Sequence, residues 1–301
     1  MIEVKGLTKS YGKKLVLDGI DLSVAAGSVT AMLGPNGAGK TTTVHILSTL
    51  VRPDGGTASV NGADVVKNPN EVRAAIGLTG QFSAVDGLLT GEENLMLMAR
   101  LRHLGGKRSR VRTAELLEQF DLTEAARKPI STYSGGMKRR LDLAMTLVTS
   151  PSVIFLDEPT TGLDPRSRHT MWQIVRGLVA DGTTVLLTTQ YLDEADELAD
   201  RIAVLDGGRI VAEGTPAELK RLVPGGHIEL QFGDLASAQS ALAVLDQSTL
   251  SDLTVTVPGA GVSGLRSALA RLDEAGLEVD DLSIHTPDLD DVFFALTGEK
   301  K

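Results

Sequence analysis

The sequence contains no cysteine, and only 3% of its 301 residues are Phe, Trp or Tyr. The absence of cysteine excludes disulfides, thiol catalysis and thiolate metal sites. Long apolar runs are also missing, because the stretch around LAMTLV is broken by Asp142 and by Ser150-Pro151, short of the roughly 18 residues that a membrane-spanning helix needs. The opening MIEVKGLTKSYGKK carries scattered charge and no apolar signal segment, so we expect the chain to stay in the compartment where it is made.

Negative charge is concentrated in the last quarter of the chain. Residues 1–224 carry 26 Lys and Arg and 26 Asp and Glu, whereas residues 225–301 carry 4 and 13, which accounts for the net charge of −9. Because duplex binding rests on cations that meet phosphates, this acidic segment argues against a nucleic-acid partner. The composition shifts at Pro224-Gly225-Gly226, a loop signal that we take as the boundary between a domain 1–224 and a domain 225–301.

In the first domain, short apolar segments alternate with helical patterns. Near-continuous apolar runs at 29–33, 76–79, 153–156 and 184–188 are typical of strands buried on both faces. Helices between such strands predict an α/β layer with a parallel sheet. The opening segments IEVKGL, IDLSV and TASVNGADV instead predict an antiparallel sheet, and residues 92–120 predict a helical subdomain.

The second domain follows a different pattern. Its apolar residues alternate in two segments and follow helical spacing in two others: Ile228, Leu230 and Phe232; Leu253, Val255 and Val257; Leu265, Leu269 and Leu272; Leu289, Val292, Phe293 and Leu296. These patterns predict a small acidic α+β domain, for which we expect a regulatory or dimerisation role.

The strongest motif is Gly34-Pro-Asn-Gly-Ala-Gly39-Lys40-Thr41, which matches G-x-x-x-x-G-K-[ST] between a strand pattern and a helix pattern. Glycines let backbone N–H groups surround phosphates, and the helix N-terminus adds about half a positive charge. Lys40 is expected to reach the β- and γ-phosphates, and the Thr41 hydroxyl to be a Mg²⁺ ligand. The motif therefore predicts a P-loop site for ATP and Mg²⁺, with nucleotide contacts from Gly34, Asn36, Gly37, Ala38, Gly39, Lys40, Thr41 and Thr42.

A second acidic motif follows at Val153-Ile-Phe-Leu-Asp157-Glu158, where an apolar strand ends in two carboxylates. Alone, such a pair is a common strand end. With a phosphate loop upstream, it predicts the other half of a nucleotide site. Asp157 would hold Mg²⁺, and Glu158 would orient or deprotonate the attacking water, a role typically worth about 10²–10⁴ in rate.

Between these motifs, Tyr133-Ser134-Gly135-Gly136-Met137 opens a basic helical segment. Ser and two glycines before a helix can make an anion-binding N-terminus, but in isolation a plain helix cap is the favoured interpretation. The order decides between these interpretations. The series runs from the P-loop through Gln81, SGG and the Asp-Glu strand to Gly162-Leu163-Asp164. It resembles the ATP-binding-cassette (ABC) ATPases, at family spacing over residues 2–222.

The resemblance implies an ABC-type P-loop NTPase fold and several site residues. Tyr11 would stack on adenine, although a strand-end aromatic residue explains Tyr11 alone equally well. Gln81 would contact Mg²⁺ and report the nucleotide state to a membrane partner. Ser134 and Gly136 would contact the γ-phosphate of ATP held by the opposite subunit, so that hydrolysis needs a head-to-tail dimer, and Asp164 would lie at the dimer interface.

Three departures from the family pattern narrow the resemblance. The signature reads YSGGM where the family usually has LSGGQ, Gln190 stands where the family has a switch histidine, and the chain ends in PDLDDVFFALTG. All three resemble the daunorubicin/doxorubicin-resistance ATP-binding proteins, which energise exporters whose membrane half is a separate polypeptide. Gln190 can still donate an amide hydrogen bond, so we count it with Lys40 and Glu158 as a catalytic residue.

The resemblance implies the ATPase subunit of an exporter of drug-like, lipid or natural-product molecules. It would bind a multi-pass permease at the cytoplasmic face of the membrane, around residues 81–98, and would pair with a second ATPase subunit. The rival function is a soluble ABC ATPase that acts on ribosomes or DNA. Such proteins usually have two cassettes or a long coiled-coil insertion, whereas this chain has one cassette and no sustained heptads.

Overall fold

The computed structural model describes residues 1–80, 84–223, 226–259 and 262–297. The chain divides into two compact units, Met1–Pro216 and Ala217–Lys301, which are described separately below. The boundary predicted at Pro224-Gly225 falls outside the described residues. Within the described part of the chain, no helix has both the length and the apolar content needed to cross a membrane.

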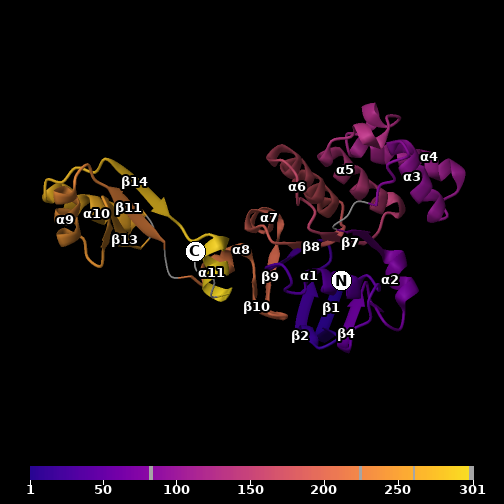
Figure 1. Cartoon of the computed structure of the whole chain (residues 1–301), viewed down its shortest axis with the longest axis horizontal. Helices are drawn as coiled ribbons and strands as arrows, with labels where there is room; N and C mark the ends of the chain where they lie inside the picture. Colours follow the sequence, from indigo (N-terminus) through magenta and orange to yellow (C-terminus); the bar gives the residue numbers. More distant parts are fainter. Residues whose placement is uncertain (81–83, 224–225, 260–261, 298–301) are drawn as a thin grey trace. The chain divides into compact units, whose positions relative to one another are not determined.

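The first unit is built on a six-stranded sheet of order β10-β9-β3-β8-β7-β6 (Figure 1). Its strands are β3 Val29–Leu33, β6 Ile76–Thr79, β7 Val153–Asp157, β8 Thr184–Thr189, β9 Arg201–Asp206 and β10 Arg209–Gly214. All neighbours pair in parallel except the hairpin β9–β10. The side chains of β3, β7 and β8 are buried throughout, as expected for strands covered on both faces. The four predicted strands are thus confirmed.

A second sheet has the order β2-β1-β4-β5 and is antiparallel, as the opening segments predicted. It consists of β1 Ile2–Tyr11, β2 Lys14–Val24, β4 Gly55–Val60 and β5 Ala63–Asp64. Helix α1, Lys40–Leu47, buries Val44 and Ile46 in a core that this sheet shares with β3 and β7 of the main sheet. Helix α1 is thereby packed against both sheets.

Helices α3 Gly91–Leu101 and α4 Gly106–Gln119 lie in the stretch 92–120 predicted to be a helical subdomain, and both pack against α5 Gly135–Thr146 (Figure 1). Thr90 and Glu93 form a reciprocal capping box at the start of α3. The remaining helices of the unit are α2 Pro69–Ala75, α6 Pro165–Ala180 and α7 Leu192–Leu198, with 3₁₀ turns at Thr123–Ala125, Ile130–Thr132 and Leu147–Thr149. Helix α8, Pro216–Lys220, spans the division between the units.

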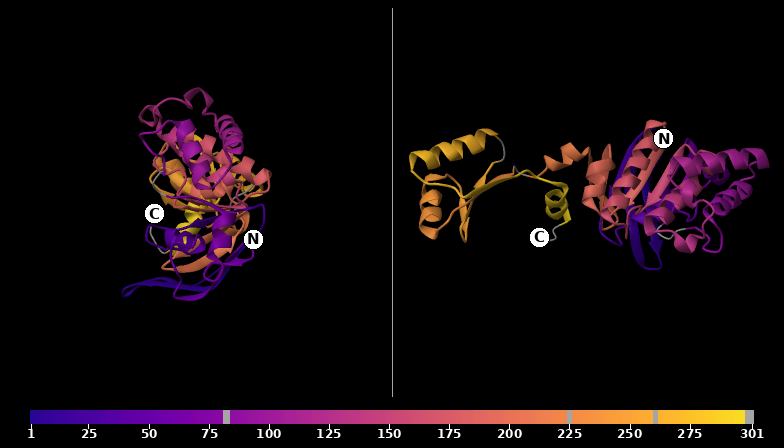
Figure 2. Two further views of the ribbon diagram at one scale, coloured as in Figure 1. Left: turned by 90° about the vertical axis from the view of Figure 1, so that its right-hand side faces the viewer. Right: turned by 90° about the horizontal axis from the view of Figure 1, so that it is seen from above.

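The second unit contains an antiparallel sheet of order β12-β13-β11-β14. The elements run β11 His227–Gln231, α9 Leu235–Val244, β12 Thr249–Ser251, β13 Thr254–Pro258, α10 Val262–Glu274 and β14 Asp281–His285. This β-α-β-β-α-β order is that of ferredoxin-like folds. Both α9 and α10 cover the sheet face that carries Ile228 and Leu230 (Figures 1 and 2). The prediction of a small α+β fold here is confirmed.

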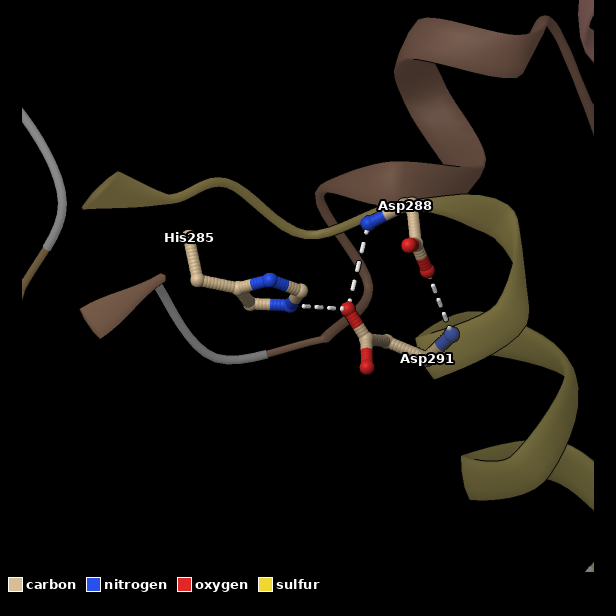
Figure 3. A group of neighbouring side chains, drawn as sticks. All are labelled: His285, Asp288 and Asp291. Carbon is tan, nitrogen blue, oxygen red and sulfur yellow. Dashed lines mark hydrogen bonds and ion pairs between the residues drawn. The ribbon is translucent and has the colours of Figure 1, made fainter. Parts of the chain in front are cut away.

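Helix α11, Leu289–Thr297, begins within the PDLDDVFFALTG motif (Figure 3). The Asp288 N–H donates to the Asp291 carboxylate at 3.2 Å, and the Asp291 N–H donates to the Asp288 carboxylate at 2.9 Å. His285 Nε2 lies 2.7 Å from the same Asp291 oxygen. One oxygen or nitrogen atom of each of the three residues lies within 4.8 Å of the other two, a spacing that could hold a metal ion. The two carboxylates, however, already serve as the helix cap. The motif therefore defines a helix start.

Candidate nucleotide-binding site

The predicted residues of the phosphate loop and of the acidic pair, and Gln190, lie where the parallel strands of the main sheet end. The phosphate loop follows β3, Asp157 ends β7, and Gln190 follows β8, which lies between those two strands. Ligands of open α/β sheets bind outside the carboxyl ends of such strands. Gln81 comes shortly after β6 in the sequence and lies outside the described residues, as does the beginning of the docking segment 81–98.

The phosphate loop has a backbone that only glycine accommodates at several points. Gly37 and Gly39 have φ of 85° and 116°, in the left-handed region that other residues avoid. A Cβ on Gly34 would lie 2.1 Å from the Leu205 carbonyl oxygen, and one on Gly39 would lie 2.5 Å from Leu17. The glycines thus allow both the turn and the close approach of strand β3 to its surroundings.

Lys40 opens helix α1 and lies almost fully buried beneath the loop. Its ammonium donates to the carbonyls of Gly34 at 2.6 Å and Pro35 at 3.1 Å, and lies 3.8 Å from the Glu158 carboxylate. Burial lowers the pKa of Lys40, while the charges of Glu158 and Asp157 oppose that shift. The structure therefore places this cation between the loop and the acidic pair.

Asp157 is buried and accepts hydrogen bonds from the hydroxyls of Thr41, at 3.2 Å, and Thr188. Glu158, the next residue, has a φ of 49°, an uncommon value for a residue other than glycine. Its N–H donates to the Thr188 carbonyl oxygen at 3.0 Å, which holds this turn. Strained backbone of this kind is concentrated at functional sites.

A cavity of about 330 Å³ lies over the loop and is lined by Tyr11, Lys14, Val16, Asn36, Gly37, Gly39, Lys40, Thr41, Thr42 and Glu158. It brings Tyr11, at the end of β1, together with the phosphate loop and Glu158. Sequence reasoning missed Lys14 and Val16. Both belong to the β1–β2 hairpin that also carries Tyr11. Their nearness to Tyr11 in the segment KSYGKKLV is the sequence feature that could have identified them.

The SGG residues form a second, separate cluster. Ser134 caps α5 by accepting the Met137 N–H at 3.2 Å, and Asp164 caps α6 by accepting the Ser167 N–H at 3.0 Å and its hydroxyl at 2.6 Å. These two bonds lower the pKa of Asp164, the hydroxyl bond contributing most. A Cβ on Gly136 would lie 2.5 Å from the Ser167 hydroxyl, so Ser167 connects the SGG motif with Asp164.

A cavity of about 190 Å³ lies at this cluster, lined by Asp121, Ser134, Gly136, Met137, Arg140, Arg166, Ser167 and Thr170. Among the described residues it shares no lining side chain with the cavity over the phosphate loop. Gln190 is half-buried after β8 and lines neither of these two cavities. One chain therefore presents the phosphate loop and the SGG motif at distinct places.

Comparisons with known proteins agree with this arrangement. Residues 17–161 match the family model of the ABC transporter. The daunorubicin resistance ATP-binding protein DrrA2 of Streptomyces coeruleorubidus is 53% identical, over 99% of this chain and 95% of that protein. The daunorubicin/doxorubicin resistance ATP-binding protein DrrA of Streptomyces peucetius is 51% identical, over 99% and 92%. The chain belongs to the ABC transporter family.

The resemblance inferred from motif order, including the daunorubicin-resistance branch, is thereby confirmed. Among solved structures, the dimeric post-hydrolysis state of the cassette MJ0796 with ADP and Pi is 28% identical, with a TM-score of 0.65 over 71% of this chain and 98% of that one. The fold is the predicted ABC-type P-loop ATPase, and the chain is an ATP-hydrolysing subunit of an ABC transporter. The assignment of particular site residues remains a prediction.

Proposed function

We propose that the cavity over the phosphate loop binds Mg-ATP and that Glu158 activates the attacking water. The observation that carries this proposal is the convergence of Lys40, Thr41, Asp157 and Glu158 at one edge of the sheet. Lys40 would bind the β- and γ-phosphates, the Tyr11 ring would stack on the base, and Glu158 would accept the water's proton. Gln190, after the intervening strand, would donate an amide hydrogen bond to the γ-phosphate.

The Thr41 hydroxyl and the Asp157 carboxylate are 3.2 Å apart, and both are oxygen donors of the kind that Mg²⁺ prefers. We propose that they hold the ion together with Gln81. When bound, Mg²⁺ would neutralise charge on the β- and γ-phosphates.

Replacement of Glu158 tests the catalytic assignment. Glu158→Gln should bind ATP with the parent's affinity and lose nearly all turnover, because the amide cannot accept the water's proton. ATP should then accumulate in a nucleotide-bound dimer that gel filtration detects. Lys40→Ala is the matched control, because it should fail to bind ATP at all. Turnover at the parent rate in Glu158→Gln would remove Glu158 from the mechanism.

We further propose that the SGG cluster completes the site of a second subunit. The separation of the two cavities within one chain supports this arrangement. Gly136→Asp protein mixed with Lys40→Ala protein should regain part of the ATPase activity, since one site of the mixed dimer carries neither change. Absence of rescue, with mixed dimers verified by differential tagging, would speak against a site shared between subunits.

We propose that hydrolysis powers efflux of a drug-like, lipid or natural-product substrate through a separate multi-pass permease at the cytoplasmic face of the membrane. The similarity over 99% of the chain to daunorubicin resistance proteins supports this role. The chain should sediment with membranes only in cells that contain its permease, and should confer resistance only there. Recovery with ribosomes or DNA instead would favour the soluble alternative.

A further inference from the structure

Arg139, on the SGG helix α5, has a guanidinium buried behind the nucleotide site, with its side chain 11% exposed. Its nitrogens donate to three successive carbonyl oxygens at the end of strand β7 and just beyond it: Asp157 at 3.2 Å, Glu158 at 3.3 Å and Pro159 at 2.8 Å. A fourth bond, of 2.8 Å, reaches the carbonyl of Gly80 beyond β6. The Arg139 side chain thus bonds to the backbone at the carboxyl ends of two neighbouring strands, β6 and β7.

Asp142 lies one turn further along α5 and is 2% exposed. Its carboxylate lies 3.2 Å from the Arg139 guanidinium and accepts the Ala84 N–H at 3.0 Å. Burial lowers the pKa of Arg139 and raises that of Asp142, while each charge opposes the shift of the other. Gly80 and Ala84 lie on either side of Gln81 in the sequence. The Arg139–Asp142 pair is therefore hydrogen-bonded to the backbone both before and after Gln81.

Buried ion pairs seldom contribute net stability, because desolvation offsets their attraction, whereas an arginine with five donors fixes geometry well. The three carbonyls that converge on Arg139 belong to the turn in which Glu158 has its positive φ. The direction of the Glu158 side chain therefore depends on how this turn is held.

We propose that Arg139, fixed by Asp142, is a positioning residue that sets the Glu158 carboxylate for catalysis and links it to the SGG helix and to the backbone beside Gln81. The inference rests on the proposed role of Glu158. The Arg139 side chain touches neither nucleotide nor water in this scheme and acts through the backbone of Asp157–Pro159.

Arg139→Lys tests the proposal, since a lysine keeps the charge but has too few donors for four carbonyls and a carboxylate. We expect kcat to fall by about 10- to 100-fold, as for a displaced catalytic group, and KM for ATP to stay within about threefold. Arg112→Lys is the matched control, because Arg112 is also part-buried, donates to the Leu147 carbonyl and pairs with Glu115 three residues on, away from both cavities. It should leave kcat unchanged.

A double variant separates positioning from stability. Arg139→Gln leaves Asp142 buried without its counter-charge and should lower Tm. Adding Asp142→Asn removes that charge and should restore Tm while kcat stays low. Recovery of kcat together with Tm, or an unchanged kcat in folded Arg139→Lys, would overturn the proposal. If Glu158→Gln kept full turnover, the proposed function itself would fail instead, so the two failures are distinguishable.

Discussion

At the scale of single residues, Glu194 shows what burial does to a carboxyl group. It lies on α7, is fully buried, and accepts the Trp172 indole N–H at 3.4 Å. Burial raises the pKa of Glu194, although hydrogen bonds partly offset the shift. Its folded-state pKa is therefore higher than its unfolded value of about 4.3.

This shift has a definite sign for stability. The folded state holds the Glu194 proton more tightly, so the contribution is fully present below the unfolded pKa and is lost as pH rises through the folded pKa. Glu194→Gln cannot ionise and should therefore have a higher Tm than the parent at pH 8, with the difference shrinking towards pH 4. Glu197→Gln, on the exposed side of the same helix, is the control and should show little pH-dependent difference. A parent that is more stable than Glu194→Gln at pH 8 would contradict the argument.

Gln190 invites a kinetic prediction. Glutamine can donate a hydrogen bond but cannot titrate, so its role should be geometric, unlike that of a histidine with an unperturbed pKa near 6.5. Gln190→Ala should slow turnover by about 10- to 10³-fold, the range for one lost transition-state donor. Gln190→His should stay active and acquire a pH dependence near neutrality. ATPase rates measured against pH for the three proteins decide this, and an alanine variant as fast as the parent would exclude the donor role.

Whether the sequence could predict a site residue depends on whether a local motif or tertiary packing brings that residue to the site. Lys40, Thr41, Asp157 and Glu158 follow strands in fixed order, so motif spacing alone placed them at one edge. Arg139 could not be found in this way, because it lies outside these motifs on a helix whose approach to the end of β7 is set by tertiary packing.

At the scale of elements, the same distinction applies to strands. The strands β3, β7 and β8 are buried on both faces, and β6 is buried except at Leu78. The apolar runs of all four marked their bounds to within one residue. By contrast, the sequence patterns did not predict β14, although Leu282 and Ile284 alternate with polar residues there as in a strand. The alternation includes only two apolar residues, and both lie on an edge strand with 41% and 40% exposure. So short a pattern does not separate an uncovered edge strand from a loop.

The capping box of α11 makes a prediction for an element. Asp288→Ala removes the acceptor of the Asp291 N–H and should cost about 1 kcal/mol of unfolding free energy in the second unit, a typical value for a lost cap. Asp288→Asn should recover most of it, because asparagine caps helices as well as aspartate does. Urea unfolding of both variants measures the difference, and equal stability of Asp288→Ala and parent would exclude a capping role.

At the scale of the whole molecule, each unit has a hydrophobic core of its own. The residues that line both cavities at the nucleotide site belong to Met1–Pro216. Deletion from Gly225 onward should therefore leave ATP affinity intact. We expect it to weaken dimers or transport, the role that we hypothesise for the acidic unit. Equilibrium dialysis and gel filtration measure these effects, and a folded truncation that no longer binds ATP would refute the assignment.

The chain contains a single tryptophan, and Trp172 sits on α6, the helix that Asp164 caps, with its indole bonded to Glu194 on α7. Emission from the protein excited at the red edge of its absorption comes from this one ring. The emission wavelength and lifetime therefore report the contact between α6 and α7, and α6 also carries Ser167 of the SGG cluster. The protein thus carries its own optical probe, readable in a cuvette without a label.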